Sequence, residues 1–225
     1  SPGLSAEGDE LTGKRLGDRY QIKRLLGRGG MGAVYLAFDE ALRTDVALKI
    51  VSAKYAGSQG TIDRIRAEVL LAQKVTHPNV CRTFDLEQIG DAQLVKMEYV
   101  AGPTLAHRLA ESPRLTVREV LEIGRQIAEG LAAAHDKKVV HCDLKPQNVL
   151  LEDGTGRVVL MDFGIAQAAS GEASSDHAGT PAFMAPEQAR GEHVDARSDV
   201  YALGCTIRHM LGGRAAPGWL RRAVN

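Results

Sequence analysis

The sequence lacks an excess of charge of either sign. Its 225 residues carry 28 basic and 28 acidic side chains, so the formal net charge is zero. Proteins that bind nucleic acid usually show a marked basic excess. Aromatic residues, which stack on bases, make up only 4% of the chain. Both shortages argue against nucleic acid as a partner.

Cysteine is scarce, and no long apolar run occurs. Cys81, Cys142 and Cys205 form no closely spaced pair, which is typical of proteins in a reducing compartment. No apolar run approaches the roughly 18 residues of a membrane-spanning helix. The first residues have neither the basic nor the apolar region of a secretory signal. The sequence therefore predicts a cytoplasmic location, either as a separate protein or as the cytosolic part of a longer, membrane-anchored one.

The remaining composition fits a globular protein with a sizeable core. Apolar residues make up 44% and charged residues 25% of the chain, as in ordinary soluble domains. The length suits one or two domains and needs no disulfide to stabilise them. Residues 1–17 begin with a stretch rich in glycine, serine and acidic residues. We expect them to form a lead that is disordered or left over from cloning.

Hydrophobic patterning divides the chain into two halves. The first half predicts strands over residues 20–26, 33–38, 46–51 and 94–100, and one helix over 61–75. In the second half, a capping box from Thr116 to Glu119 opens a helix that continues to Ala134. Short β segments are expected over 139–140 and 158–161, and a last helix over 200–211. The predicted fold class is α+β, with one lobe over 18–101, a second over 102–225 and a cleft between them.

A glycine-rich segment, G-x-G-x-x-G-x-V, runs from Gly27 to Val34 between two expected strands. Glycine allows the backbone to approach a phosphate, and the N–H groups of such a loop can donate to it. By itself the pattern fits a glycine-rich hairpin equally well. A dinucleotide-binding Rossmann fingerprint is disfavoured, because a helix should follow it and a strand is predicted instead.

Lys49 is the one charged residue in the apolar strand 46–51. A buried lysine needs a partner, and Glu68 lies 19 residues later on the inner face of the predicted helix. The alternative is a lysine at a strand edge whose ammonium reaches solvent. Its position after the glycine segment favours the functional pair.

The most specific motif is His-Cys-Asp-Leu-Lys-Pro-Gln-Asn, from His141 to Asn148, which resembles the catalytic loop of eukaryotic-like protein kinases. The Asp-Phe-Gly triplet at 162–164 resembles their metal-binding triplet. Residues 184–187 resemble the end of their activation segment, and 198–204 the helix after it. With the glycine segment and Lys49, these motifs follow the order of the family. Over about residues 20–211 the chain resembles a bacterial Hanks-type Ser/Thr protein kinase catalytic domain.

This resemblance implies a bilobal fold with a β-rich N-lobe, one main helix and a helical C-lobe. It also implies transfer of the γ-phosphate of ATP to Ser or Thr hydroxyls of protein substrates, including the chain itself, with Mg²⁺ or Mn²⁺ as cofactor. Phosphoryl transfer depends on positioning and charge neutralisation more than on covalent catalysis, which suits the charged residues of these motifs.

The resemblance assigns a role to each catalytic position. Asp143 would orient the substrate hydroxyl or accept its proton, and Lys145 would neutralise the γ-phosphate. Lys49, held by Glu68, would bind the α- and β-phosphates. The remaining roles are metal binding by Asn148 and Asp162, and support of Asp143 and Lys145 by Thr180. The ATP pocket would be formed by Leu26, Gly27, Gly29, Gly32, Val34, Ala47, Lys49, Met97, Glu98, Val100 and Leu150, with Met97 as gatekeeper.

The chain departs from the family pattern in three places. Cys142 replaces an arginine that normally pairs with a phosphorylated activation-loop residue, so loop phosphate would lose its main charged partner. Glu187 has no evident arginine partner. After Leu211 only residues 212–225 remain, where the family has several more helices, so we expect a shortened C-lobe.

Two other functions are alternatives to a Ser/Thr kinase. A pseudokinase, which would bind nucleotide or act as a scaffold, usually lacks at least one catalytic residue, whereas all of them are present here. A small-molecule kinase of the same fold is disfavoured, because residues 179–187 resemble a peptide-binding platform. The sequence leaves open the substrate, the upstream signal and the oligomeric state.

Overall fold

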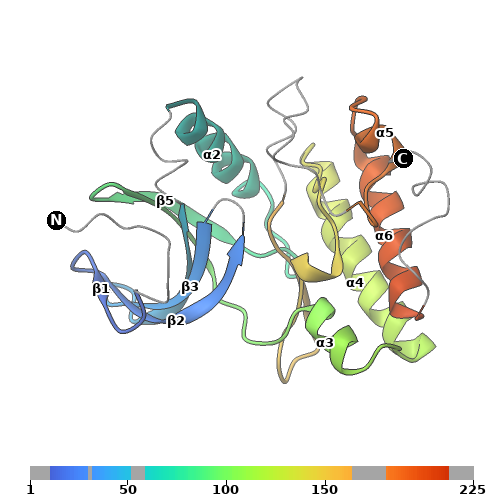
Figure 1. The fold of residues 1–225 in the computed structure, drawn as a ribbon, viewed down its shortest axis with the longest axis horizontal. Coiled ribbons are helices and arrows are strands. Elements are labelled where there is room, and N and C mark those ends of the chain that lie inside the picture. Colours follow the sequence, from blue (N-terminus) through green and yellow to red (C-terminus); the bar gives the residue numbers. More distant parts are fainter. Residues whose placement is uncertain (1–10, 30–31, 52–58, 164–180, 213–225) are drawn as a thin grey trace. The chain divides into compact units, whose positions relative to one another are not determined.

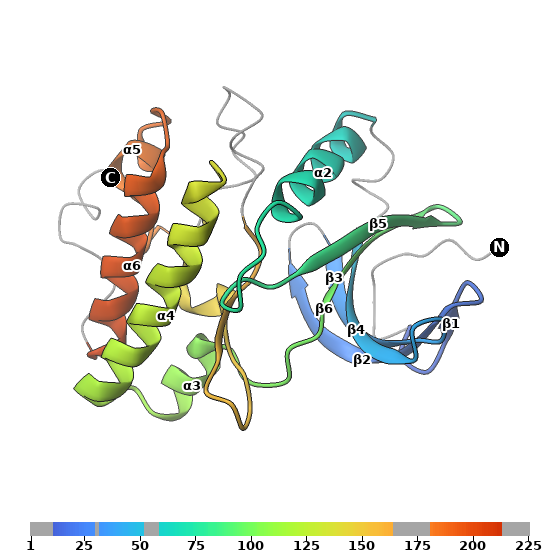
Figure 2. The same cartoon turned by 180° about the vertical axis from the view of Figure 1, so that it is seen from behind.

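The computed structural model describes residues 11–29, 32–51, 59–163 and 181–212 (Figures 1 and 2). The chain divides into two compact units. The first comprises residues 1–73 and 82–99, and the second comprises residues 74–81 and 100–225. None of the described helices is both long enough and apolar enough to cross a membrane. The kinase-like architecture expected from the motifs is confirmed, with a β-rich first unit and a helical second one.

The first unit is built on a six-stranded antiparallel sheet in the order β1-β2-β3-β4-β6-β5. Its elements are β1 (Arg15–Leu16), β2 (Tyr20–Gly29), β3 (Gly32–Asp39), β4 (Thr44–Val51), α2 (Gln59–Ala72), β5 (Thr83–Ile89) and β6 (Ala92–Glu98). Four of these strands and the helix were predicted. Strand β5 was missed, although Phe84 and Leu86 alternate with polar residues over Thr83–Glu87. The alternation covers only five residues, and all residues of the strand are partly or fully exposed.

The assignment of residues 1–17 to a lead is wrong for residues 11–17. Strand β1 pairs with β2, with Leu16 opposite Tyr20. Leu16 is only 6% exposed, and Leu11 packs against the same core. Two residues are too few to give an alternating pattern, so the strand could not be found from the sequence.

The two faces of this sheet pack differently. One face holds a core that includes Tyr35, Leu48 and Leu94. On the other face, Ile65 and Val69 of α2 pack in a cluster with Val51 and Val95. The strand register therefore decides which residues lie on the side of the sheet that α2 covers.

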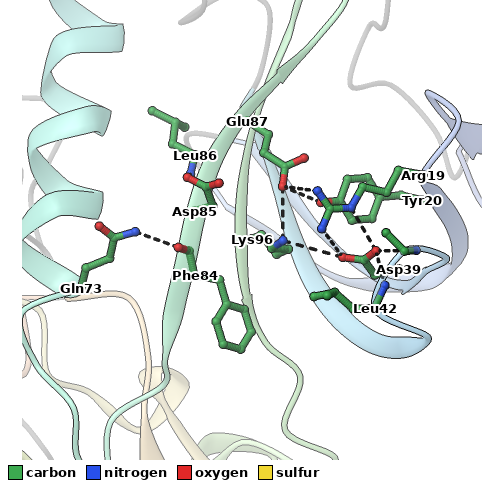
Figure 3. A network of polar contacts seen from close by, with 11 residues as sticks. Arg19, Tyr20, Asp39, Leu42, Gln73, Phe84, Asp85, Leu86, Glu87 and Lys96 are labelled. Carbon is green, nitrogen blue, oxygen red and sulfur yellow. Dashed lines mark hydrogen bonds and ion pairs between the residues drawn. The ribbon is translucent and has the colours of Figure 1, made fainter.

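A network of charged side chains surrounds the buried Asp39 in the first unit (Figure 3). Arg19 donates from Nε and Nη2 to the two oxygens of Asp39, at 3.0 and 2.8 Å, and from Nη1 to Glu87 at 3.2 Å. Tyr20 donates to the same oxygen of Glu87 at 2.7 Å. Lys96, on β6, places its ammonium 3.3 Å from Glu87 and 3.7 Å from Asp39. Two cations thus balance two carboxylates, which makes the burial of these charges tolerable.

Asp39 is fully buried at the centre of this network. Burial by itself would raise its pKa, but the hydrogen bonds from Arg19 and from the Leu42 amide outweigh it. They hold the pKa of Asp39 below its ordinary value of 3.8. The carboxylate therefore stays ionised and stabilises the folded state at neutral pH.

The second unit is mainly helical. Its elements are α3 (Leu105–Glu111), α4 (Val117–Asp136), the 3₁₀ helix η1 (Pro146–Asn148), β7 (Val149–Leu151), β8 (Val158–Leu160), α5 (Pro186–Ala189) and α6 (Ala196–Met210). Strands β7 and β8 form a separate antiparallel pair. Helices α4 and α6 lie side by side (Figures 1 and 2). Ile127, Leu131, Leu144, Leu160 and Met210 are among the buried residues of the core.

Capping residues determine where helices α4 and α6 begin. The predicted capping box of α4 is confirmed, since Thr116 N donates to Glu119 at 2.7 Å and Glu119 N donates to the Thr116 hydroxyl. Helix α6 begins at Ala196, four residues before the predicted start, because Asp195 caps it by accepting from Arg197 N. Helix α3 was not predicted, and the expected β segment at 139–140 is not a strand.

Residues 74–81 belong to the second unit, although the predicted boundary placed them in the first. Leu160 N donates to Asn79 O at 2.9 Å, and Cys81 N donates to Leu160 O at 2.8 Å. The buried Asn79 side chain also donates to Val158 O and to Gln126. These hydrogen bonds tie residues 74–81 to β8 and α4. The later boundary between the units, at residues 99–100, lies close to the predicted boundary at residues 101–102.

We predict that Arg19→Met lowers the free energy of unfolding by about 1–3 kcal/mol, because it leaves the buried Asp39 carboxylate without its main donors. The control is Lys23→Met, which breaks the exposed Lys23–Asp45 pair and should cost less than about 1 kcal/mol. Denaturant unfolding measures both. The loss at Arg19 should shrink as the pH falls from 3.8 through the lower pKa of folded Asp39, since the Asp39 carboxyl becomes protonated over that range. Equal losses in the two variants would contradict the prediction.

Candidate active site

The loop between α4 and β7 brings three predicted catalytic residues together. Lys145 Nζ lies 2.7 Å from Asp143 Oδ2. Asn148 Nδ2 donates to the same oxygen at 3.0 Å and to the Asp143 carbonyl at 2.8 Å. Pro146 occupies the first turn of η1, where its fixed φ suits the turn that returns Asn148 to Asp143. One carboxylate oxygen of Asp143 is thus held by two donors, and Oδ1 makes neither of these contacts.

This arrangement suits orientation of a hydroxyl group. The side chains of Asp143 and Lys145 remain 31% and 19% exposed, so a substrate can reach them. An ammonium beside the carboxylate places positive charge where phosphate oxygens would approach. The oxygen Oδ1 can accept a hydrogen bond from a hydroxyl while Oδ2 stays fixed.

Asp199, on α6, anchors the backbone of this loop. Its Oδ2 accepts from His141 N at 2.8 Å and lies 2.7 Å from His135 Nε2, and its Oδ1 accepts from Cys142 N at 2.9 Å. The side chain is 1% exposed. Sequence reasoning quoted Asp199 only as part of a helix motif and missed this role. The signal in the sequence was an acidic residue on the buried face of a helix. Such a carboxylate needs hydrogen-bond donors from elsewhere in the chain.

His141 packs beneath the loop. It is fully buried, and its ring centroid lies 4.5 Å from that of Phe163. Its Nδ1 is 3.3 Å from the donating Asp143 amide. Burial lowers the pKa of His141, so the ring is neutral at physiological pH and serves packing rather than proton transfer.

Cys142 occupies a backbone conformation that is uncommon for a residue with a side chain. Its φ is 63°, in the left-handed region. Its thiol lies 3.7 Å from the Val140 carbonyl, to which it donates. Burial, followed by the nearby Asp199 and Asp143 carboxylates, raises the pKa of the Cys142 thiol to about 12. The residue that replaces the family arginine is therefore uncharged.

The two predicted metal ligands, Asn148 and Asp162, lie on segments joined by a backbone hydrogen bond. Asp162 comes directly after the β8 region, and Met161 N donates to Asn148 O at 2.9 Å. Since Asn148 Nδ2 is used by Asp143, the amide oxygen is the atom that it could offer to a cation. A carboxylate and an amide oxygen are the donors that Mg²⁺ prefers, with water and phosphate oxygens completing its octahedron. These residues fit a magnesium ion.

In the first unit, the register places the predicted phosphate and adenine residues on one face. Val34 lies opposite Lys49, and Met97 lies opposite Ala47 on the neighbouring strand. Gly29 pairs with Gly32 at the end of the β2–β3 hairpin, and Gly27 pairs with Val34. Leu26 lies at the irregularity between Leu25 and Gly27 and is 36% exposed.

The other predicted ATP-pocket residues lie at the end of β6 and in the second unit. Glu98 lies opposite Val46 in the sheet, and its backbone N–H donates to Arg82 O at 2.8 Å. Val100 is buried in the second unit, and Leu150 lies on β7 opposite Val159.

Two predicted residues lie outside what the structure describes. The Glu68 side chain is one of them, although Ile65 and Val69, on either side of it in α2, pack on the Lys49 face of the sheet. Thr180 is the other. The Lys49–Glu68 pair and the role of Thr180 stay predictions.

Glu187, for which no arginine partner was found in the sequence, accepts a hydrogen bond from Ser198 Oγ at 2.5 Å. Ser198 directly precedes Asp199 on α6. The first turn of α6 therefore holds both the loop and α5, a connection that the motif order alone did not indicate.

We predict that the native Cys142 thiol reacts about a thousand times more slowly with iodoacetamide at neutral pH than the same thiol in the denatured chain. The reason is that only the thiolate reacts, and the pKa rises from 9.0 to about 12 on folding. Mass spectrometry of the alkylated peptides measures the rate. Similar rates in the two states would contradict the buried, neutral thiol.

Curated relatives resemble this chain over most of its length. The serine/threonine-protein kinase PrkC of Bacillus subtilis is 41% identical over 207 residues, which are 91% of this chain and 32% of PrkC. The serine/threonine-protein kinase PknB of Mycobacterium tuberculosis is 37% identical over 211 residues, 90% of this chain and 34% of PknB. The chain thus spans about a third of the length of these relatives.

Solved structures and a family model agree with the sequence relatives. A crystal structure of the PknI kinase domain of Mycobacterium tuberculosis matches with a TM-score of 0.71 and 30% identity, covering 92% of this chain and 79% of that one. The model of the protein kinase domain matches residues 20–217. With the Asp143 loop in place and this match over most of its length, the chain belongs to the protein kinase family.

Proposed function

We propose that the chain is a protein serine/threonine kinase, which transfers the γ-phosphate of ATP to Ser or Thr hydroxyls of protein substrates, including itself. The observation that carries this proposal is the Asp143 carboxylate, held on one oxygen by Lys145 and Asn148. The relatives named Ser/Thr kinases support it.

The residues of the loop would act by position and charge. The substrate hydroxyl would donate to Asp143 Oδ1, which orients its oxygen toward the γ-phosphate and receives its proton late in the transfer. Lys145, already beside Asp143, would neutralise the charge on the transferred group. When bound by Asn148 and Asp162, Mg²⁺ would neutralise the phosphate oxygens. Transfer needs no covalent bond to the protein.

Residues of the first unit would bind ATP. Lys49 lies on the same face of the sheet as Val34, Ala47 and Met97. The Lys49 ammonium, which would bind the α- and β-phosphates, belongs to a residue directly opposite Val34 and two residues from Ala47, and these apolar residues would pack on adenine. The Gly29–Gly32 hairpin lies next to them on β2 and β3, where a backbone without side chains allows close approach to phosphate.

We further propose that the kinase acts in the cytoplasm, alone or as the cytosolic part of a longer, membrane-anchored protein. Its three cysteines are free thiols, as expected in a reducing compartment, and ATP is abundant there. Its partners would be ATP and proteins with Ser or Thr acceptors, not nucleic acid.

We predict that Asp143→Asn lowers phosphate transfer from radiolabelled ATP to a generic basic protein by about 10²–10⁴-fold, because the amide cannot accept the hydroxyl proton. The control is Asp136→Asn, the same change at an exposed position near the end of α4, which should transfer at the wild-type rate. Wild-type transfer by Asp143→Asn, or no transfer by the unaltered chain, would refute the proposed function.

We also predict that nucleotide binding depends on the metal. ATP with Mg²⁺ should raise the melting temperature more than ATP with EDTA, since a ligand at 100 times its dissociation constant stabilises by about 2.7 kcal/mol. Asp162→Asn should reduce this difference, because it removes a charged oxygen ligand. Equal shifts with Mg²⁺ and with EDTA in the wild type would contradict the assigned metal site.

A further inference from the structure

Three hydrogen bonds, connected through residues that are neighbours in the sequence, form a ring that begins and ends on the backbone of Cys142. Cys142 N donates to Asp199 Oδ1 at 2.9 Å. The neighbour of Asp199, Ser198, donates to Glu187 at 2.5 Å. The neighbour of Glu187, Gln188, donates from Nε2 back to the Cys142 carbonyl at 2.7 Å. We call these five residues the Cys142 ring.

The ring joins three segments that are distant in sequence. Gln188 and Cys142 are 46 residues apart, and Cys142 and Asp199 are 57 residues apart. Ser198 and Asp199 are each 1% exposed, and the other members are half-buried. Hydrogen bonds in such surroundings are costly to break, because water does not readily replace the lost partner.

Gln188 uses both ends of its amide. Its Oε1 accepts from Ala185 N at 3.0 Å, at the start of α5, while Nε2 donates to Cys142. The first bond satisfies an N–H group at a helix start, and any polar acceptor could do this. The second bond serves no helix, because Cys142 lies in the catalytic loop.

The Cys142 carbonyl is a sensitive point of that loop. Cys142 has a φ of 63°, a left-handed conformation that is unfavourable for an L-residue and persists only where the surroundings hold it. The peptide group that contains this carbonyl also contains Asp143 N, which donates to His141 O at 2.9 Å. A hydrogen bond to the Cys142 carbonyl therefore fixes the orientation of the peptide plane between Cys142 and Asp143, and with it the direction of the Asp143 side chain.

We propose that Gln188 is a positioning residue for Asp143. By holding the Cys142 carbonyl, it keeps the strained backbone in the conformation that directs the Asp143 carboxylate, and it makes this geometry depend on the placement of residues 181–190. The inference rests on the proposed kinase function. Gln188 acts through Cys142 and touches neither substrate nor metal.

Two variants separate this role from helix capping. Gln188→Met keeps a similar shape and removes both hydrogen bonds. Gln188→Glu keeps an oxygen that can accept from Ala185 N, but an ionised carboxylate cannot donate to the Cys142 carbonyl and is repelled by it. A protonated glutamic acid can donate a hydrogen bond, so the activity of Gln188→Glu should depend on pH in a way that the activity of Gln188→Met does not.

Steady-state kinetics with ATP and a protein substrate test the proposal. Both variants should lower kcat about tenfold at pH 8, equal to about 1.4 kcal/mol, with KM for ATP within twofold of wild type. The kcat of Gln188→Glu, divided by that of wild type at each pH, should rise as the pH falls and the carboxyl becomes protonated. A capping role alone would leave Gln188→Glu fully active at pH 8.

The matched control is Gln73→Met. Gln73 donates from Nε2 to the Phe84 carbonyl at 2.8 Å, so the variant loses the same kind of bond away from the Cys142 ring. Its kcat should equal that of wild type. A kcat within twofold of wild type for Gln188→Met, or a wild-type kcat for Gln188→Glu at pH 8, would overturn the proposal.

Amide hydrogen exchange gives a readout that needs no activity. The Cys142 and Asp143 amides should exchange faster in Gln188→Met and in Gln188→Glu than in Gln73→Met. If the wild-type chain transfers no phosphate, the proposed function fails and exchange still tests the ring. If Gln188→Met does not fold, Gln188→Glu carries the test, and unchanged exchange in it overturns the proposal.

Discussion

The buried Asp199 carboxylate is the constraint on which the candidate active site depends. It satisfies two consecutive backbone N–H groups, of His141 and Cys142, immediately before Asp143. A buried N–H left without a partner costs about 1–3 kcal/mol, so the loop stays where these acceptors are. Because Asp199 is in the first turn of α6, a helix packed against α4, the loop takes its geometry from the core of the second unit.

Charge is handled differently in the two units. In the first, Arg19 and Lys96 balance Asp39 and Glu87 inside the sheet, which is a structural use of ion pairs. In the second, the Asp143–Lys145 pair is left partly exposed. The two carboxylates Asp39 and Asp143 differ in use because they differ in burial. Asp39 is 0% exposed and stabilises the fold, whereas Asp143 is 31% exposed and remains available to a substrate.

Backbone conformation contributes as much to the site as side-chain chemistry. Cys142 and Asp162 are two non-glycine residues with positive φ, at 63° and 48°, and both lie at predicted catalytic segments. Strained residues persist only where their surroundings hold them. At Cys142 the holding groups are Asp199 on one side and Gln188 on the other, which ties the loop to both α6 and α5.

The sequence by itself determined the features whose parts lie close together in the chain. Asp143, Lys145 and Asn148 fall within six residues, the α4 capping box within four, and the central strands show their own hydrophobic pattern. Tertiary structure alone decided the roles of Asp199, Ser198 and Gln188 and the place of residues 74–81. The hydrogen-bond partners of Asp199, Ser198 and Gln188 lie 57, 11 and 46 residues away. A hydrogen bond between distant residues leaves no local pattern, because either partner alone looks like an ordinary polar residue.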